Sequence, residues 1–169
     1  CSMFVPAEDF VVSYGASDLA TCERATHVMK KSPNDIRKLQ VSGFYLDIDL
    51  QDASSDPDQV KEKYNELTGD NGSYESDSRH TLLEMQVDLD LPGFEDSQNG
   101  KLTGIHLPYV VTIDLGSREI LAIRRNWYES DQYKNKREHF VHYQYIPGLG
   151  FYGFGLIHMI GGLAKSATS

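Results

Sequence analysis

Two histidines are the first residues in this sequence whose spacing could do chemistry. His139 and His142 form an H-x-x-H pair, and on a helix that spacing helps to build a metal site. The sequence predicts a strand over 139–146. Because residues three apart on a strand point to opposite faces, we expect the two imidazoles to diverge. The sequence therefore predicts no metal at this pair and no catalytic metal elsewhere.

Four aspartates form two pairs that could bind a cation. Asp47 with Asp49, and Asp88 with Asp90, have the i, i+2 spacing that places both carboxylates on one face of a strand. Two such pairs could hold a magnesium or calcium ion. Carboxylates in this arrangement are more often the solvated side of a sheet. A small metal-dependent hydrolase that uses these strand carboxylates is therefore kept only as an alternative.

A run of glycines near the C-terminus resembles a nucleotide-binding loop by spacing alone. Residues 148–153 read G-x-G-x-x-G, but the dinucleotide fingerprint needs a strand–turn–helix unit with an acidic residue about 20 positions further on. No acidic residue follows this run. Serine nucleophile motifs and cysteine–histidine motifs are also absent from the sequence. We therefore expect no catalytic residues, no cofactor and no enzymatic activity.

Basic and aromatic residues are interleaved in one stretch that could bind a partner. We call this stretch the basic cluster, and it consists of Arg124, Arg125, Trp127, Lys134, Lys136 and Arg137, with Tyr128 and Tyr133 between them. Such a cluster could contact a nucleic-acid backbone or an acidic protein surface. The simpler alternative is the solvated end of a hairpin.

Charge is unevenly distributed along the chain. The net charge of −9 argues against a protein that grips DNA non-specifically. Residues 44–100 carry fifteen acidic and three basic side chains, whereas residues 101–169 carry five acidic and eight basic ones. The basic cluster of one subunit could therefore contact the acidic block of the next.

Short strands and helices must position these groups. Local signals mark two of the elements: Ser32, Pro33 and Asp35 form a helix start, and Gly43 is a favoured terminator. The Asn99-Gly100 pair predicts a tight hairpin turn. The expected strands span 4–13 (interrupted at Pro6), 25–30, 45–50, 80–91, 109–115, 120–127 and 139–146. The expected helices span 33–40, 57–68 and about 153–169, and 70–78 is expected to be a loop.

The C-terminal segment is unusually apolar. Between Phe151 and Leu163 the single readily charged side chain is His158, yet the run is too short and too glycine-rich to span a membrane. We expect a helix over about 153–169 that packs on other chains. Its expected contact residues are Phe154, Leu156, Ile157, Ile160, Gly161, Leu163 and Ala164.

Together these elements predict a single α+β domain over residues 1–169. Its architecture should be an antiparallel β-meander with short helices and a C-terminal apolar helix. The β-rich region is expected over about 80–147.

Several segments resemble the portal (head-to-tail connector) proteins of short-tailed double-stranded-DNA bacteriophages. They are VPAEDFVV at 5–12, DIRKLQVSGF at 35–44, LPYVVTID at 107–114, IRRNW at 123–127 and, most specifically, HFVHYQYIPGLGFYGFGLIHMIGG at 139–162. The resemblance covers most of the chain and is weakest over 51–78 and 92–104.

The resemblance implies a structural role. Portal subunits form a homo-oligomeric ring, usually of twelve, which replaces one capsid vertex and forms the channel for packaged and ejected DNA. The ring docks the terminase and then the tail adaptor protein, and it has no catalytic residues of its own. It assembles in the host cytoplasm and ends in the virion. Because portal subunits are much longer, the resemblance implies a fragment that covers part of the wing rather than the clip. A monomeric adaptor module is the remaining alternative.

Overall fold

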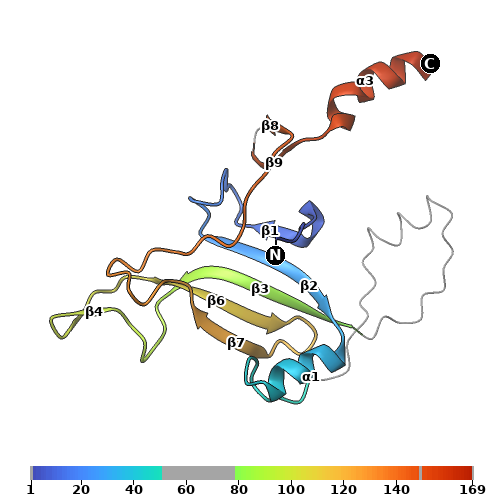
Figure 1. Ribbon diagram of the computed structural model, residues 1–169. Coiled ribbons are helices and arrows are strands. Elements are labelled where there is room, and N and C mark those ends of the chain that lie inside the picture. Colours follow the sequence, from blue (N-terminus) through green and yellow to red (C-terminus); the bar gives the residue numbers. More distant parts are fainter. Residues whose placement is uncertain (1, 51–78, 149, 169) are drawn as a thin grey trace. The chain divides into compact units, whose positions relative to one another are not determined.

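The computed structural model describes residues 2–50, 79–148 and 150–168, and all structural statements concern these residues. Figure 1 shows the arrangement of the elements. In chain order they are η1 (Ala7–Asp9), β1 (Phe10–Val12), β2 (Arg24–Lys31), α1 (Pro33–Val41), β3 (His80–Leu89), β4 (Ser97–Gln98), β5 (Lys101–Leu102), β6 (Leu107–Asp114), β7 (Ile120–Arg125), β8 (Ile146–Gly148), β9 (Gly150–Phe154) and α3 (Leu156–Thr168).

The strands confirm the predicted α+β class with an antiparallel sheet. Five strands form one sheet in the order β1-β2-β3-β6-β7, and the hairpins β4-β5 and β8-β9 form two small sheets of their own (Figure 1). In the β1–β2 pair, Phe10 lies opposite His27 and Val12 lies opposite Ala25. Strands that follow one another along the chain are therefore neighbours in the sheet, apart from the inserted β4-β5 hairpin.

Contacts within the chain divide it into two compact units. The first unit comprises Cys1–His27, Met85–Val111 and Arg124–Ser169, and the second comprises Val28–Glu84 and Thr112–Ile123. Each unit has its own cluster of buried apolar side chains, so each is described by itself.

The core of the second unit lies between α1 and strand residues. Ile36 of α1, Leu82 of β3 and Leu121 of β7 are at most 2% exposed, and Leu39 packs against the same cluster. Helix α1 starts as the sequence predicts, because the hydroxyl of Ser32 accepts a hydrogen bond from the Asp35 amide at 3.2 Å. The helix ends shortly before Gly43.

The core of the first unit is largely aromatic. Phe10 of β1 packs edge-on against Phe140, with ring centroids 4.8 Å apart, and stacks on Phe151 of β9 at 5.9 Å. Cys22 and Ala25 complete the buried part of this cluster. The hydroxyl of Tyr152 donates to the Phe10 carbonyl at 2.8 Å, which fixes β9 to β1.

The turn predictions are confirmed. Asn99 and Gly100 have φ values of 53° and 74°, the positive pair that a tight two-residue hairpin of this kind requires. The β6–β7 connection is also a hairpin turn, in which the Asp114 amide donates to the Glu119 carbonyl at 3.0 Å. The C-terminal helix is present as α3, and the predicted strand at 25–30 is β2.

The strand predicted over 45–50 is wrong. The Leu46 amide donates to the Leu121 carbonyl at 2.8 Å, but the chain then leaves the strand ladder. The carbonyls of Leu46 and Ile48 instead accept from the side-chain amide of Gln40, at 3.2 and 2.8 Å. A side chain of α1 therefore takes the place of a partner strand, which alternation in the sequence does not reveal.

The strand predicted over 139–146 is also wrong. Only Ile146–Gly148 is strand, and it pairs with β9 in a hairpin that the sequence analysis missed. Before it, Phe140 is held against Phe10, and the Gln144 side-chain amide donates to the Phe151 carbonyl at 2.6 Å. Side-chain contacts with Phe10 and Phe151 hold this segment, in which residues 139–145 are assigned to no strand.

Two further strand predictions differ from the structure, and two other predictions fall in residues that it does not describe. The strand expected over 4–13 is in fact a short 3-10 helix, η1, followed by β1, and the Asp9 amide donates to the Pro6 carbonyl at 3.1 Å. The strand expected over 109–115 begins earlier, as β6. The predicted helix at 57–68 and loop at 70–78 lie outside the described residues.

Candidate functional site

The basic cluster lies in the first unit, at the end of β7 and in the loop that follows. The loop is closed by backbone hydrogen bonds: the Asn126 amide donates to the Pro108 carbonyl and the Arg137 amide donates to the Asn126 carbonyl, each at 2.9 Å. The Asn126 side chain is 1% exposed, and its Oδ1 lies 2.8 Å from Nε2 of His139. The cluster is thus mounted on an ordered loop.

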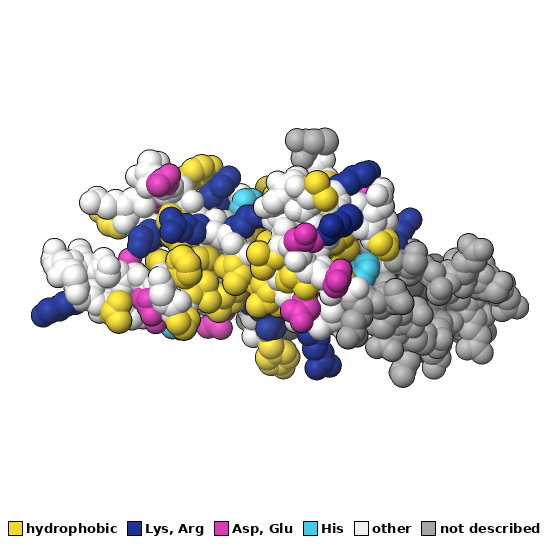
Figure 2. All heavy atoms as spheres, turned by 90° about the horizontal axis from the view of Figure 1, so that it is seen from below, with side chains coloured by type: hydrophobic (Ala, Val, Ile, Leu, Met, Phe, Trp, Pro, Cys, Tyr) yellow, Lys and Arg dark blue, Asp and Glu magenta, His cyan; other side chains and the backbone are white. Residues whose placement is uncertain are grey.

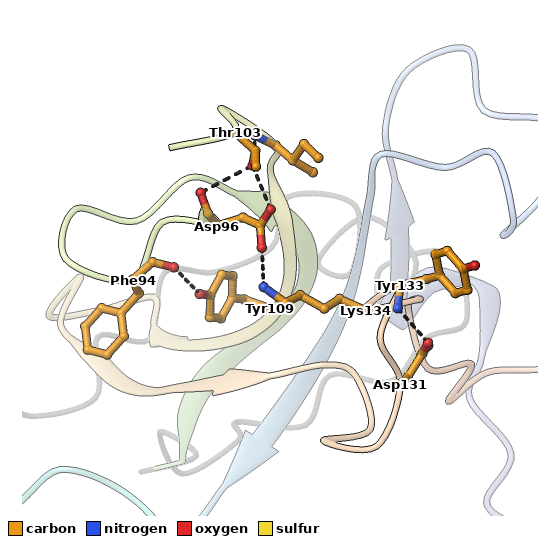
Figure 3. A network of polar contacts seen from close by, with 8 residues as sticks. Phe94, Asp96, Thr103, Tyr109, Asp131, Tyr133 and Lys134 are labelled. Carbon is orange, nitrogen blue, oxygen red and sulfur yellow. Dashed lines mark hydrogen bonds and ion pairs between the residues drawn. The ribbon is translucent and has the colours of Figure 1, made fainter. Parts of the chain in front are cut away.

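Two lysines of the basic cluster are used within the chain. Lys134 forms an ion pair with Asp96, whose carboxylate also accepts from the Thr103 hydroxyl at 2.7 Å (Figure 3). The Nζ atom of Lys136 donates to the carbonyls of Leu19 and Cys22, both at 3.3 Å. Both ammonium groups therefore have partners in their own unit and are poorly placed for a strong contact with a phosphate.

Two carboxylates of the first unit accept hydrogen bonds from this loop. The hydrogen bond from Lys134, and then that from Thr103, holds the pKa of Asp96 below its usual value. Asp131 accepts from the amides of Tyr133 and Asn135 at 3.0 and 2.9 Å, and these bonds lower its pKa as well. Figure 3 shows Asp131 beside the backbone of Tyr133, and Lys134 reaching across to Asp96.

The arginines of the cluster lie against aromatic rings. The guanidinium of Arg137 is 4.5 Å from the centre of the Tyr128 ring, and that of Arg125 is 5.9 Å from the Trp127 ring. Trp127 packs edge-on against Tyr109 at 5.4 Å. Arg124 is half-buried and also has a partner. What the cluster offers to another molecule is therefore the exposed Arg125, Tyr128 and Tyr133.

The predicted contact residues of the tail lie on and beside α3, and they are exposed. Leu156, Ile160 and Leu163 are 54%, 46% and 73% exposed, and Phe154 just before the helix is 43% exposed. Ala164 is exposed and Gly161 is half-buried. The backbone of Ile157 lies in α3. The chain itself leaves the described apolar side chains of this helix in solvent.

Glycines in α3 are not explained by packing within the chain. A Cβ atom at Gly161 or Gly162 would meet no atom within 4 Å. Glycine inside a helix costs about 0.5–1 kcal/mol relative to alanine. No close neighbour in the described part of the chain offsets that cost, whereas a second helix approaching closely would require small residues there.

Exposed apolar side chains are not confined to the tail. Figure 2 shows hydrophobic side chains gathered in a central patch on the face that it draws, with basic and acidic groups around them. Leu115, Ile120 and Ile123 on and around β7 are 53%, 40% and 45% exposed.

The residues considered for metal binding are dispersed. Asp47 forms an ion pair with Arg37 of α1, and neither Asp47 nor Asp49 is in a strand, so the predicted same-face pair does not form. His139 contacts Asn126, whereas the His142 ring stacks on Phe151 at 3.9 Å. Within the described ranges, no three histidine, cysteine or acidic side chains lie close enough together to hold a metal ion.

A buried histidine–aspartate pair in the second unit was missed by the sequence analysis. Nδ1 of His80 lies 3.2 Å from Oδ1 of Asp114, and the two side chains are 7% and 1% exposed. The other Asp114 oxygen accepts from the amide and the hydroxyl of Ser117, at 2.8 and 2.7 Å. The two residues are separated by 34 positions, and no local motif connects them.

His80 also lines a cavity of about 440 Å³ in the same unit. The other walls are Ile36, Arg37 and Gln40 of α1, and the chain from Asp47 to Leu50. This cavity combines a buried imidazole, carboxylates and apolar side chains in one place.

No family model matches the sequence, and a search of curated proteins finds no significant match. No helix among the described residues is both long and apolar enough to cross a bilayer.

Proposed function

We propose that this chain is a structural subunit of a bacteriophage portal vertex, which associates with copies of itself. Apolar side chains of α3 that the chain leaves exposed carry the proposal, because Leu156, Ile160 and Leu163 would gain by burial against another chain. The open space around Gly161 and Gly162 supports close approach of a neighbouring helix. The segment at 139–162 that resembles portal proteins includes this helix.

In this proposal the chain is part of the wing of a larger subunit, in a ring usually of twelve that surrounds the DNA channel. The ring binds the terminase during packaging and the tail adaptor afterwards. Duplex DNA passes through without tight binding, which is consistent with the net charge of −9 and with the internal partners of Lys134 and Lys136. The complex assembles in the host cytoplasm and remains in the virion.

Solution mass tests the proposal. The chain should form oligomers whose population rises with concentration when it is measured by light scattering or native mass spectrometry. Leu163→Lys should shift the population toward monomer, because it places a charge on the apolar surface of α3. The matched control is Leu102→Lys in β5, where the leucine is 70% exposed compared with 73% for Leu163. This control should associate as the wild type does.

A second variant separates association from helix stability. Gly161→Leu removes a helix-destabilising glycine at a position with open space around it. The helix content measured by circular dichroism should therefore stay the same or rise, while association falls. A chain that is monomeric at every concentration, or equal effects of Leu163→Lys and Leu102→Lys, would contradict self-association through α3 and favour a monomeric adaptor.

A further inference from the structure

The cavity in the second unit has two polar groups that the described chain leaves without a partner. The guanidinium of Arg37 donates to Asp47 and, at 3.3 Å, to Oε1 of Gln40. The Gln40 amide nitrogen donates to the Leu46 and Ile48 carbonyls. These groups are therefore occupied within the unit. In the described residues, Asp49 and Nε2 of His80 have no hydrogen bond or ion pair.

In the neutral form of the imidazole, the unpaired nitrogen of His80 is a hydrogen-bond acceptor. The Asp114 carboxylate can only accept, and its second oxygen already accepts twice from Ser117, so Nδ1 of His80 carries the hydrogen between them. The neutral imidazole then presents its lone pair on Nε2. The His80 side chain is only 7% exposed, but Nε2 is not among the described buried atoms that lack a hydrogen-bond partner, so it keeps access to water in the cavity. A donor placed in the cavity would replace that water.

The charges of the lining favour a ligand with one positive charge. The lining contains one guanidinium, on Arg37, and two carboxylates, on Asp47 and Asp49. Arg37 and Asp47 neutralise each other, which leaves the exposed Asp49 as the uncompensated negative charge among the described lining residues. These residues offer no matching set of carboxylates to a polyamine with several positive charges, and the described ranges bring no three metal ligands together.

The remaining walls suit an aliphatic stem. Ile36 is 2% exposed, and Ile48 and Leu50 lie across the same cavity. Lysine and arginine bury their methylene groups along apolar surface while their charged end finds acceptors. A cavity of about 440 Å³ is at the small end of the range for ligand sites, and it has room for one such side chain.

From these features we propose that the cavity binds a lysine or arginine side chain of a partner protein. The cationic group lies between the Asp49 carboxylate and Nε2 of His80, and the stem packs along Ile36, Ile48 and Leu50. This site is separate from α3, so it does not depend on the proposed self-association.

N-acetyl-arginine methylamide is a suitable probe for this site. Its binding is followed by NMR through the imidazole resonances of the full chain. The His80 signal is assigned by its disappearance in His80→Gln. We expect a saturable shift of that signal with a Kd of about 1 mM, as befits a single small side chain. Asp49→Asn should weaken binding about tenfold, because it removes a charge-assisted hydrogen bond. The matched control Asp88→Asn, also at an exposed carboxylate, should leave the Kd unchanged.

Two further ligands complete the test. N-acetyl-citrulline methylamide has nearly the same shape without the charge and should bind at least about tenfold more weakly. Spermidine should bind no more tightly than the arginine probe. No saturable His80 shift at about ten times the expected Kd, equal binding of the citrulline probe, or equal effects of Asp49→Asn and Asp88→Asn would overturn the proposal. Much tighter binding of spermidine would overturn the assignment to a protein side chain.

Discussion

In the second unit the core lies mainly between a helix and strands, whereas in the first unit strand residues share the core with residues from segments without regular structure. Ile36, Leu82 and Leu121 of the second unit come from α1, β3 and β7 and are almost fully buried. In the first unit, Leu19, Cys22 and Phe140 belong to the cluster but to no helix or strand. Burial of residues on helices and strands therefore accounts for only part of the first core.

The difference shows how an irregular core is stabilised. Side chains of the first unit donate to backbone carbonyls: Lys136 to Leu19 and Cys22, Gln144 to Phe151, and Tyr152 to Phe10. Buried backbone groups must be paired, and here polar side chains supply part of that pairing. The four predictions that follow test this comparison, starting with the largest expected effect.

Leu82→Ala should have the largest effect on stability. Leu82 is completely buried between α1 and the sheet, so its loss should lower the free energy of unfolding by about 2–5 kcal/mol. Chemical denaturation measures the change. Leu102→Ala, at a leucine that is 70% exposed, should change it by no more than about 0.5 kcal/mol. Similar values for the two variants would mean that the second unit is not tightly packed.

Phe140→Leu should lower the free energy of unfolding by less, because Phe140 is only partly buried against the first core. Leucine keeps much of the apolar volume but removes the edge-on contacts with Phe10 and His27, at 4.8 and 5.9 Å. An aromatic pair contributes about 0.5–1.5 kcal/mol beyond its buried area, and we expect a loss of that order. The neighbouring Val141→Ala, at a side chain that is 96% exposed, is the control in the same denaturation experiment. A cost as large as that of Leu82→Ala would remove the distinction between the two cores.

The ion pair of Asp96 and Lys134 should give a smaller, pH-dependent effect. The pKa of Asp96 is lower in the folded chain than its ordinary value of 3.8, so the folded state favours the ionised carboxylate. Its contribution to stability is complete above pH 3.8 and is lost as the pH falls from there through the lower folded pKa. The stability difference between wild type and Asp96→Asn should shrink over that acid range. A constant difference for Asp96→Asn would contradict the ion pair.

Binding to duplex DNA should be the weakest effect of all. Because Lys134 and Lys136 are held inside the first unit, we expect a Kd no tighter than about 1 µM at about 0.15 M salt. Any residual affinity should fall with Arg125→Ala more than with Lys136→Ala, since the Lys136 ammonium donates to Leu19 and Cys22. Fluorescence anisotropy with labelled duplex measures both. Submicromolar binding would show that the loop releases its lysines to a phosphate backbone.

Local signals in the sequence predicted much of the fold. Ser32 and Pro33 start α1, and the Asn99-Gly100 pair forms its hairpin turn. Both depend on backbone geometry that neighbouring residues determine among themselves. The strand predictions were less accurate: they identified β2, β3, β6 and β7 with boundaries shifted by a few residues, but they failed at 45–50, where alternation was the signal, and at 139–146. Alternation reports an extended, half-buried chain and contains no information on whether a partner strand lies beside it.

The candidate sites show the same contrast between features made by neighbouring residues and features made by distant ones. The basic cluster and the apolar C-terminal helix could be found in the sequence, because their residues lie close together along the chain. The internal partners of Lys134 and Lys136 could not, since Asp96 and Leu19 are 38 and 117 positions away. The cavity around His80 could not be predicted from the sequence either.

By itself, the sequence determined the fold class, the caps and turns of its local elements, and the composition of the segment that became α3. Those features follow from backbone preferences and from hydrophobic periodicity over a few residues. Only the tertiary structure decided which cations are neutralised and which of the expected strands pair with another strand. It also decided that His80 contacts Asp114 and lines a cavity. These depend on which distant residues the packed chain brings within hydrogen-bonding distance, and no local preference specifies that.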